Sequence, residues 1–197
     1  MRAEIIKLRQ KINTTFMYVT HDQTEAMTLG DRIVIMKDGF IQQIGTPQEV
    51  FDHPANLFVA GFIGMPQMNF FDAELSIEDG RYFVNYDAMK VELSEEKQAK
   101  LRANGVKSQK VTLGVRPEHI SLEDGGIETK IEVSEMMGSS VHLHVNVGGK
   151  DVIVVVSTVN MTHAETAALT AGSTVKLAFS GNNCHVFSKE TELSLEA

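Results

Sequence analysis

The first residues of the chain alternate between helical and extended patterns of apolar positions. Residues 4–12 place isoleucine and leucine on one helical face with basic residues outside it, which predicts an amphipathic helix. Residues 15–20 form a continuous apolar and β-branched run. Such a run after an amphipathic helix is typical of a parallel strand buried on both faces. A short helix is expected over residues 23–29.

A hairpin follows these elements. Residues 32–37 and 40–44 have the composition of strands, and Asp38-Gly39 between them strongly favours a two-residue turn. Together with the preceding pattern, the hairpin predicts the last part of an α/β sheet whose earlier strands are not in the chain.

Two short helices are expected next, each with its own start signal. Thr46 and Glu49 form a capping-box pattern with proline at the first helical position. Asn56 can cap the second helix, which is expected to run to Ile63 and to stop at Gly64.

From Met68 onward, short strands and turns dominate the pattern. Residues 141–147 alternate valine or leucine with histidine and asparagine, as a half-buried strand does. One helix is expected over residues 94–103, with Ser94 as its cap. Further strands are expected at residues 111–115, 130–133, 152–156 and 175–179. Closely spaced short strands favour a small barrel of the oligonucleotide/oligosaccharide-binding (OB) type, or a sandwich.

Composition narrows the possible partners. The 197 residues carry a net charge of −8 without a marked basic run, which argues against nucleic acid and anionic lipid. No apolar stretch reaches the roughly 18 residues of a membrane span. Cys184 is the only cysteine, so no disulfide forms within the chain and a reducing cytoplasm is the expected compartment.

One histidine stands where chemistry is expected. His21 directly follows the apolar run, and α/β sheets place their chemistry at the edge where parallel strands end. An imidazole there can hydrogen-bond a phosphate oxygen or a positioned water without a fixed charge. A lone histidine can equally cap a helix or lie satisfied at a boundary, so the residue alone leaves both interpretations open.

Several ordered motifs resemble one protein family. Residues 18–26 (Tyr-Val-Thr-His-Asp-Gln-Thr-Glu-Ala) resemble the switch-histidine loop of ABC transporter ATPases, and residues 30–39 resemble that family's final hairpin. Residues 56–70 are similar to the linker of maltose- and glycerol-phosphate-type importer ATPases. Residues 113–120 and 187–191 resemble the entry and the closing strand of their regulatory domain. The resemblance spans nearly the whole chain.

The resemblance implies a fold class and three regions. The fold would be an α/β remnant of an ABC-type nucleotide-binding domain followed by a mainly β, OB-like (TOBE) regulatory domain. Residues 1–45 would be the end of the ATPase domain with the switch-histidine loop, residues 46–67 a helical linker, and residues 68–197 the regulatory domain.

The resemblance also assigns a role to His21. In that family the corresponding histidine contacts the γ-phosphate and helps to hold the attacking water, so His21 would be both the catalytic and the ATP-contacting residue. ATP and Mg would be cofactors of the intact protein. The sequence lacks a Gly-x-x-x-x-Gly-Lys-Ser/Thr loop, a Leu-Ser-Gly-Gly-Gln signature and an apolar strand ending in Asp-Glu. We therefore expect a fragment that binds no ATP and hydrolyses none by itself.

The implied partners are those of a carbohydrate importer. The resemblance predicts a homodimer through the regulatory domain, contact with membrane permease subunits, and a peripheral location at the cytoplasmic face of the membrane. Neither nucleic acid nor sugar is expected to bind the chain directly. The alternative is a small-ligand sensor, because similar barrels in related importers bind oxyanions. The acidic balance and the sugar-type linker argue against this alternative.

Histidines in the second half raise the question of a metal site. His142 and His144 share one face of a predicted strand, as a ligand pair requires, while His119 and His163 lie elsewhere in the sequence. No third ligand is identifiable, and the exposed face of a surface strand is the expected place for the pair. We therefore expect no metal site.

Overall fold

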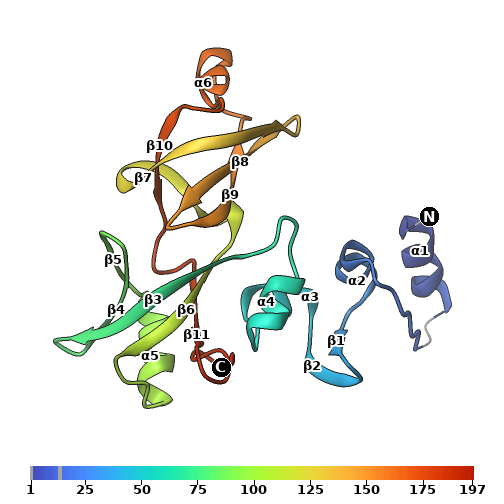
Figure 1. The fold of residues 1–197 in the computed structure, drawn as a ribbon. Coiled ribbons are helices and arrows are strands. Elements are labelled where there is room, and N and C mark those ends of the chain that lie inside the picture. Colours follow the sequence, from blue (N-terminus) through green and yellow to red (C-terminus); the bar gives the residue numbers. More distant parts are fainter. Residues whose placement is uncertain (1, 13–14) are drawn as a thin grey trace. The chain divides into compact units, whose positions relative to one another are not determined.

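The computed structural model describes residues 2–12 and 15–197. These residues divide into two compact units, Met1–Met65 and Pro66–Ala197, and each is described by itself. The division falls between residues 65 and 66, and the two short helices after the hairpin belong to the first unit (Figure 1). None of the described helices is long and apolar enough to cross a membrane.

The first unit combines one hairpin with four helices. Its elements are α1 (Arg2–Ile12), α2 (Gln23–Leu29), β1 (Ile33–Lys37), β2 (Phe40–Gly45), α3 (Pro47–Asp52) and α4 (Leu57–Phe62). The predicted two-residue turn is confirmed: Lys37 pairs with Phe40, and Asp38 and Gly39 both have positive φ. Positive φ at both central residues is the geometry that matches the twist of a hairpin, and glycine adopts it without steric cost.

Two predicted helix starts are also confirmed. The Thr46 hydroxyl accepts a hydrogen bond from the Glu49 N–H, and the Glu49 carboxylate accepts one from the Thr46 N–H, which completes a capping box at α3. The Asn56 side chain accepts a hydrogen bond from Val59 N at 2.9 Å and caps α4. These bonds satisfy N–H groups that a helix start leaves without partners.

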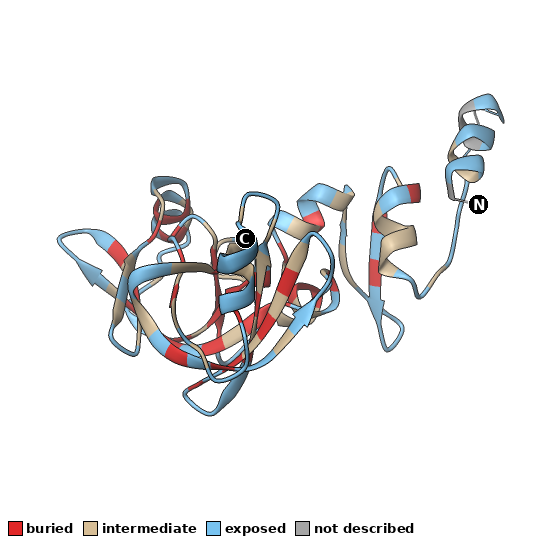
Figure 2. Cartoon of the chain, turned by 90° about the horizontal axis from the view of Figure 1, so that it is seen from above, coloured by how far each residue is buried: buried red, intermediate tan, exposed pale blue. Residues whose placement is uncertain are grey.

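A small apolar cluster holds the first unit together. Buried residues of β1, α3 and α4 form this cluster, together with Ile63 just after α4. Figure 2 colours the buried residues of the chain red. The buried members are Ile33, Ile35, Val50, Val59 and Ile63. Ala26 and Met27 of α2 pack against this cluster, so it fixes α2 beside the hairpin and α4.

The second unit is built from two antiparallel sheets. Its elements are β3 (Asn69–Glu78), β4 (Arg81–Tyr86), β5 (Met89–Glu92), α5 (Glu95–Ala103), β6 (Gln109–Val115), η1 (Pro117–His119), β7 (Ser121–Met136), β8 (Ser140–Val147), β9 (Lys150–Ser157), α6 (His163–Ala168), β10 (Thr174–Ala178) and β11 (Cys184–Ser188). One sheet has the strand order β11-β6-β3-β4-β5 and the other β10-β7-β8-β9.

The alternating strand predicted at residues 141–147 is β8. Val141, Leu143, Val145 and Val147 are buried, while the residues between them are half-buried or exposed. Their buried side chains join a large apolar cluster with residues of β3, β6 and β11. One core therefore connects the two sheets, which supports the prediction of a mainly β, OB-like domain.

A side chain also joins the two sheets directly. Asn69, at the start of β3, donates a hydrogen bond to Ile153 O at 2.8 Å and accepts one from Ile153 N at 2.9 Å. Ile153 belongs to β9, the edge strand of the other sheet. The nearly buried amide thus occupies backbone groups that a sheet edge would otherwise leave unpaired.

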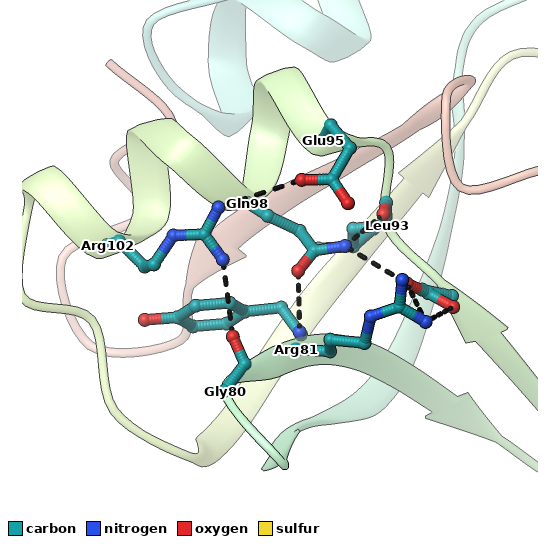
Figure 3. A network of polar contacts seen from close by, with 8 residues as sticks. Gly80, Arg81, Leu93, Glu95, Gln98 and Arg102 are labelled. Carbon is teal, nitrogen blue, oxygen red and sulfur yellow. Dashed lines mark hydrogen bonds and ion pairs between the residues drawn. The ribbon is translucent and has the colours of Figure 1, made fainter.

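Helix α5 is fixed to the β4–β5 hairpin by a polar network (Figure 3). Gln98, with 1% of its surface exposed, accepts a hydrogen bond from Tyr82 N at 3.2 Å and donates one to Leu93 O at 2.8 Å. Around it, Arg102 contacts Gly80 O and Glu95.

The predicted cap position of this helix is confirmed, but the expected side-chain hydrogen bond is not formed. Ser94 occupies the N-cap position, but its hydroxyl makes no capping bond and lies buried without a partner among the described residues. Glu95 and Glu96 in the first turn interact favourably with the helix dipole and offset part of that loss.

The last residues fold back onto β11. Leu195 N donates to Val186 O at 2.9 Å, and the Glu196 carboxylate accepts from Val186 N at 2.9 Å and pairs with Lys97 Nζ at 2.6 Å. Both charged side chains are about nine-tenths buried. The pair therefore covers the outer edge of β11 and ties it to α5.

The Gln98 network gives a stability prediction. Gln98→Met keeps the length of the side chain but leaves Tyr82 N–H and Leu93 C=O without partners, and each buried orphan costs about 1–3 kcal/mol. We expect urea titration to show a free energy of unfolding of the second unit lowered by about 2–4 kcal/mol. The matched control is Gln109→Met at the exposed first residue of β6, which should change stability by less than about 0.5 kcal/mol. Equal stability of the two variants would contradict this account.

Candidate functional site

Residues 15–20, which lead to His21, belong to no strand and no helix. The prediction of a strand buried on both faces is wrong here: Met17 and Val19 are 88% and 89% exposed, and Phe16 and Tyr18 are exposed as well. A parallel strand needs hydrogen-bonding neighbours. The sheet described in the first unit consists of β1 and β2, which pair with each other.

His21 lies at the end of this segment with its side chain exposed. The residues on both sides of it are fixed. Thr20 Oγ1 donates to Glu25 Oε2 at 2.8 Å, and Asp22 N donates to Thr20 Oγ1 at 3.0 Å. Asp22 Oδ1 in turn accepts from Thr24 N at 2.7 Å and caps α2. An accessible imidazole is thus carried on a turn whose two ends are hydrogen-bonded.

Glu25 is the centre of these contacts, whereas the sequence analysis named it only as a member of the motif at residues 18–26. Its carboxylate accepts hydrogen bonds from Thr20 and from the Tyr18 hydroxyl, the latter at 3.1 Å. The hydrogen bond to Glu25 and the charge of that carboxylate raise the pKa of Tyr18, because a phenolate beside a carboxylate is disfavoured. The five-residue spacing from Thr20 to Glu25 predicts this contact only if residues 15–20 are not expected to form a regular strand.

The Gly-Gly-Lys sequence at residues 148–150 forms a simple turn rather than a phosphate-binding loop. Gly148 and Gly149 have positive φ and connect β8 with β9. Lys150 Nζ lies 2.7 Å from Asp72 Oδ2, and Lys189 pairs with the other oxygen of the same carboxylate. The hydrogen bond from Lys150, followed by that from Lys189, lowers the pKa of Asp72 to about 2. Lys150 is therefore engaged in an ion pair that connects β9 with β3.

The histidine pair of β8 does not form a common ligand set. His144 Nδ1 lies 3.5 Å from Asp151 and Nε2 lies 3.5 Å from Glu135, so the two carboxylates flank opposite sides of one ring. A single ion cannot bridge ligands on opposite ring nitrogens. Within residues 2–12 and 15–197, no group of three or more histidine, cysteine or acidic side chains is placed to hold a metal ion. Burial raises the pKa of the Cys184 thiol to about 12, which makes it a poor ligand and a poor nucleophile.

Two grooves of the second unit bear on the oxyanion alternative. One has a volume of about 360 Å³ and carries Glu118, His119 and Glu123 in its lining. The other, of about 690 Å³, contains three lysines, of which two are paired with Asp72, and three further acidic residues. Carboxylates in both linings repel an anion, so neither groove favours an oxyanion ligand.

The fold and these sites define a class: an OB-type β domain joined to a small α/β unit in which His21 is exposed directly after residues 15–20. Two family models match the second unit, the MalK OB fold domain at residues 64–120 and the TOBE domain at residues 113–187. The chain belongs to the family of ABC transporter ATP-binding subunits that carry these two domains.

Individual relatives agree with this assignment. The chain is 44% identical to the uncharacterized ABC transporter ATP-binding protein YcjV of Escherichia coli O6:H1, over 99% of this chain and 52% of that protein. It is 41% identical to the oligosaccharides import ATP-binding protein MsmX of Bacillus subtilis, over 99% of this chain and 53% of the relative. It is 43% identical to the sn-glycerol-3-phosphate import ATP-binding protein UgpC of Ruegeria sp., over 97% of this chain and 50% of that protein. The chain spans about half the length of these curated relatives.

A solved structure resembles part of the fold. The molybdate-binding protein ModG aligns with 60% of this chain and 94% of its own, at 14% identity and a TM-score of 0.47. A likeness at this level supports no inference about ligands.

The contact between Tyr18 and Glu25 can be tested by titration. Glu25→Gln removes the carboxylate charge, so the pKa of Tyr18 should fall toward its ordinary value of 10.0. Ultraviolet absorbance against pH measures the ionisation, and Tyr18→Phe identifies its contribution among the three tyrosines. Glu4→Gln, an exposed change in α1, is the control. An unchanged Tyr18 titration in Glu25→Gln would show that the contact is not formed in solution.

Proposed function

We propose that this chain is the C-terminal part of the ATP-hydrolysing subunit of a carbohydrate importer. It would supply the switch histidine in its first unit and a regulatory domain in its second. The observation that carries the proposal is the exposed His21 on a turn anchored through Thr20, Asp22 and Glu25. Similarity to MsmX and UgpC, the ATP-binding proteins of oligosaccharide and sn-glycerol-3-phosphate import, supports the substrate class.

The role of His21 follows from its position. ATP with Mg, in the intact protein, would provide a terminal phosphoryl group for hydrolysis by water. We assign this role to His21 because it lies in the motif at residues 18–26 on an anchored turn, its side chain is exposed, and a neutral imidazole offers one donor and one acceptor. Fixed residues on both sides limit the movement of the ring, so less entropy is lost when it engages a phosphoryl oxygen or a water. The sequence contains no phosphate-cradling loop, and we expect no ATP turnover from the chain alone.

The partners proposed for the intact protein are a second copy and the permease. The second unit would contribute to a homodimer contact, and permease subunits would bring the protein to the cytoplasmic face of the membrane. In this proposal the sugar passes through the permease and does not bind the chain.

Mutation of His21 in the intact subunit, assembled with its permease, tests the proposal. His21→Ala should lower the rate of ATP hydrolysis by roughly 10²-fold or more, because a positioned imidazole typically contributes that much. Equilibrium nucleotide binding should stay within a few-fold, because His21 is one contact among many. His142→Ala, on β8 of the second unit, is the control and should retain turnover. Full turnover in His21→Ala would refute the assigned role.

The exposed apolar segment provides a second test. We propose that residues 15–20 pair with neighbouring strands in the intact subunit, which would remove Met17 and Val19 from water. Amide hydrogen exchange should be fast at residues 16–19 in this chain and at least about 100-fold slower in the intact subunit. Residues 33–37 of β1, already paired with β2, serve as the internal control. Equally fast exchange at residues 16–19 in both proteins would exclude this pairing.

A further inference from the structure

A hydrogen bond connects the His21 segment with the end of the first unit. Gln23 Oε1 accepts from the backbone N–H of Gly64 at 2.7 Å, although the two residues are 41 positions apart. Gln23 is the first residue of α2 and lies two positions after His21. Gly64 follows the end of α4, two positions before the second unit begins at Pro66.

We propose that Gln23 is a positioning residue that couples the His21 turn to the point where the chain leaves the first unit. This inference rests on the proposed function of His21. Through Gln23, the conformation of residues 20–22 would affect the segment after α4 that leads into the second unit.

The backbone at Gly64 is suited to such a contact. Helix α4 ends at Phe62, and the cap residue Ile63 donates its N–H to Val59 O at 3.0 Å. Gly64 then adopts a φ of +119°, which an L side chain rarely tolerates and which turns the chain out of the helix. Its N–H is partly buried and directed to the Gln23 side chain.

An apolar contact reinforces the hydrogen bond. Ile63, only 1% exposed, belongs to the cluster against which Ala26 and Met27 of α2 pack. The residue before Gly64 and the helix that begins with Gln23 therefore share one core. Packed cores shift between discrete arrangements rather than deform smoothly, so α2 and the end of α4 move together.

The other end of the path reaches His21. Asp22 caps the helix that Gln23 begins, and its N–H donates to Thr20 Oγ1. His21 thus lies between Thr20, which is fixed on Glu25, and Asp22, which is fixed on α2. A displacement of the His21 turn acts on Gly64 through Gln23, and a restraint on Gly64 acts back with the same coupling free energy.

The first experiment measures the link in the chain itself by amide hydrogen exchange at Gly64. Gln23→Met keeps the side-chain length without an acceptor, and we expect Gly64 to exchange about tenfold faster. Gln23→Glu keeps an oxygen acceptor and should stay within about threefold of wild type. Gln48→Met, which removes an exposed contact to Asp52 in α3, is the matched control and should leave Gly64 unchanged. Unchanged exchange in Gln23→Met, or equal acceleration in Gln23→Glu, overturns the inference.

The second experiment measures the coupling in the intact subunit assembled with its permease. Hydrogen exchange of residues 62–67 should differ with and without ATP in wild type and in Gln23→Glu, and the difference should be lost in Gln23→Met. A difference that persists in Gln23→Met, or that is absent in wild type, contradicts the coupling. ATP turnover of His21→Ala is measured in parallel and tests the proposed function alone. Failure of the function and failure of the link are therefore distinguishable.

Discussion

The position of His21 depends on a small apolar core that the histidine itself does not touch. Residues of β1, α3 and α4 form this core, and α2 rests on it through Ala26 and Met27. A unit of about 65 residues can bury only roughly 60% of its unfolded surface, so each buried side chain carries a large share of its stability. A change at Ile63 or Val59 would therefore move α2, and with it the turn that carries His21, without altering any residue of that turn.

The second unit is stabilised by a larger apolar core and by polar contacts inside the fold. Its core is shared by two sheets, and buried polar side chains connect elements distant in sequence: Asn69 with β9, Gln98 with the β4–β5 hairpin, and Lys97 with Glu196. A satisfied buried polar group contributes modestly to stability but is costly to misplace, which selects one arrangement of the strands over others. Such contacts hold the second unit in one arrangement of its strands.

The sequence predicted the features that depend on neighbouring residues. The turn at Asp38-Gly39, the capping box at Thr46 and the cap at Asn56 all lie within a few residues of the groups they satisfy. The alternation of apolar and polar residues in β8 likewise reflects the buried and the less buried face of that strand. The buried strand at residues 15–20 was wrong because apolar composition states what a segment favours, whereas burial requires partners elsewhere. The bond from Gly64 to Gln23 had no local signal at all, since only the fold brings these residues together.

The exposed apolar residues of the first unit complete this reasoning. Besides the segment at residues 16–19, the outward side chains of the hairpin are exposed, among them Val34, Met36 and Ile41. Exposed apolar residues at two places in one small unit indicate surfaces that favour a partner rather than water. The segment that precedes His21 is one of them, so whatever covers Met17 and Val19 also determines where the imidazole points. Glu25 restrains the turn through Thr20, and Gln23 restrains it through Gly64. In the proposed intact subunit, the covering strands would restrict the ring further. If strands of the intact subunit cover Met17 and Val19 as proposed, the exposure of these residues and the freedom of the His21 ring would decrease together.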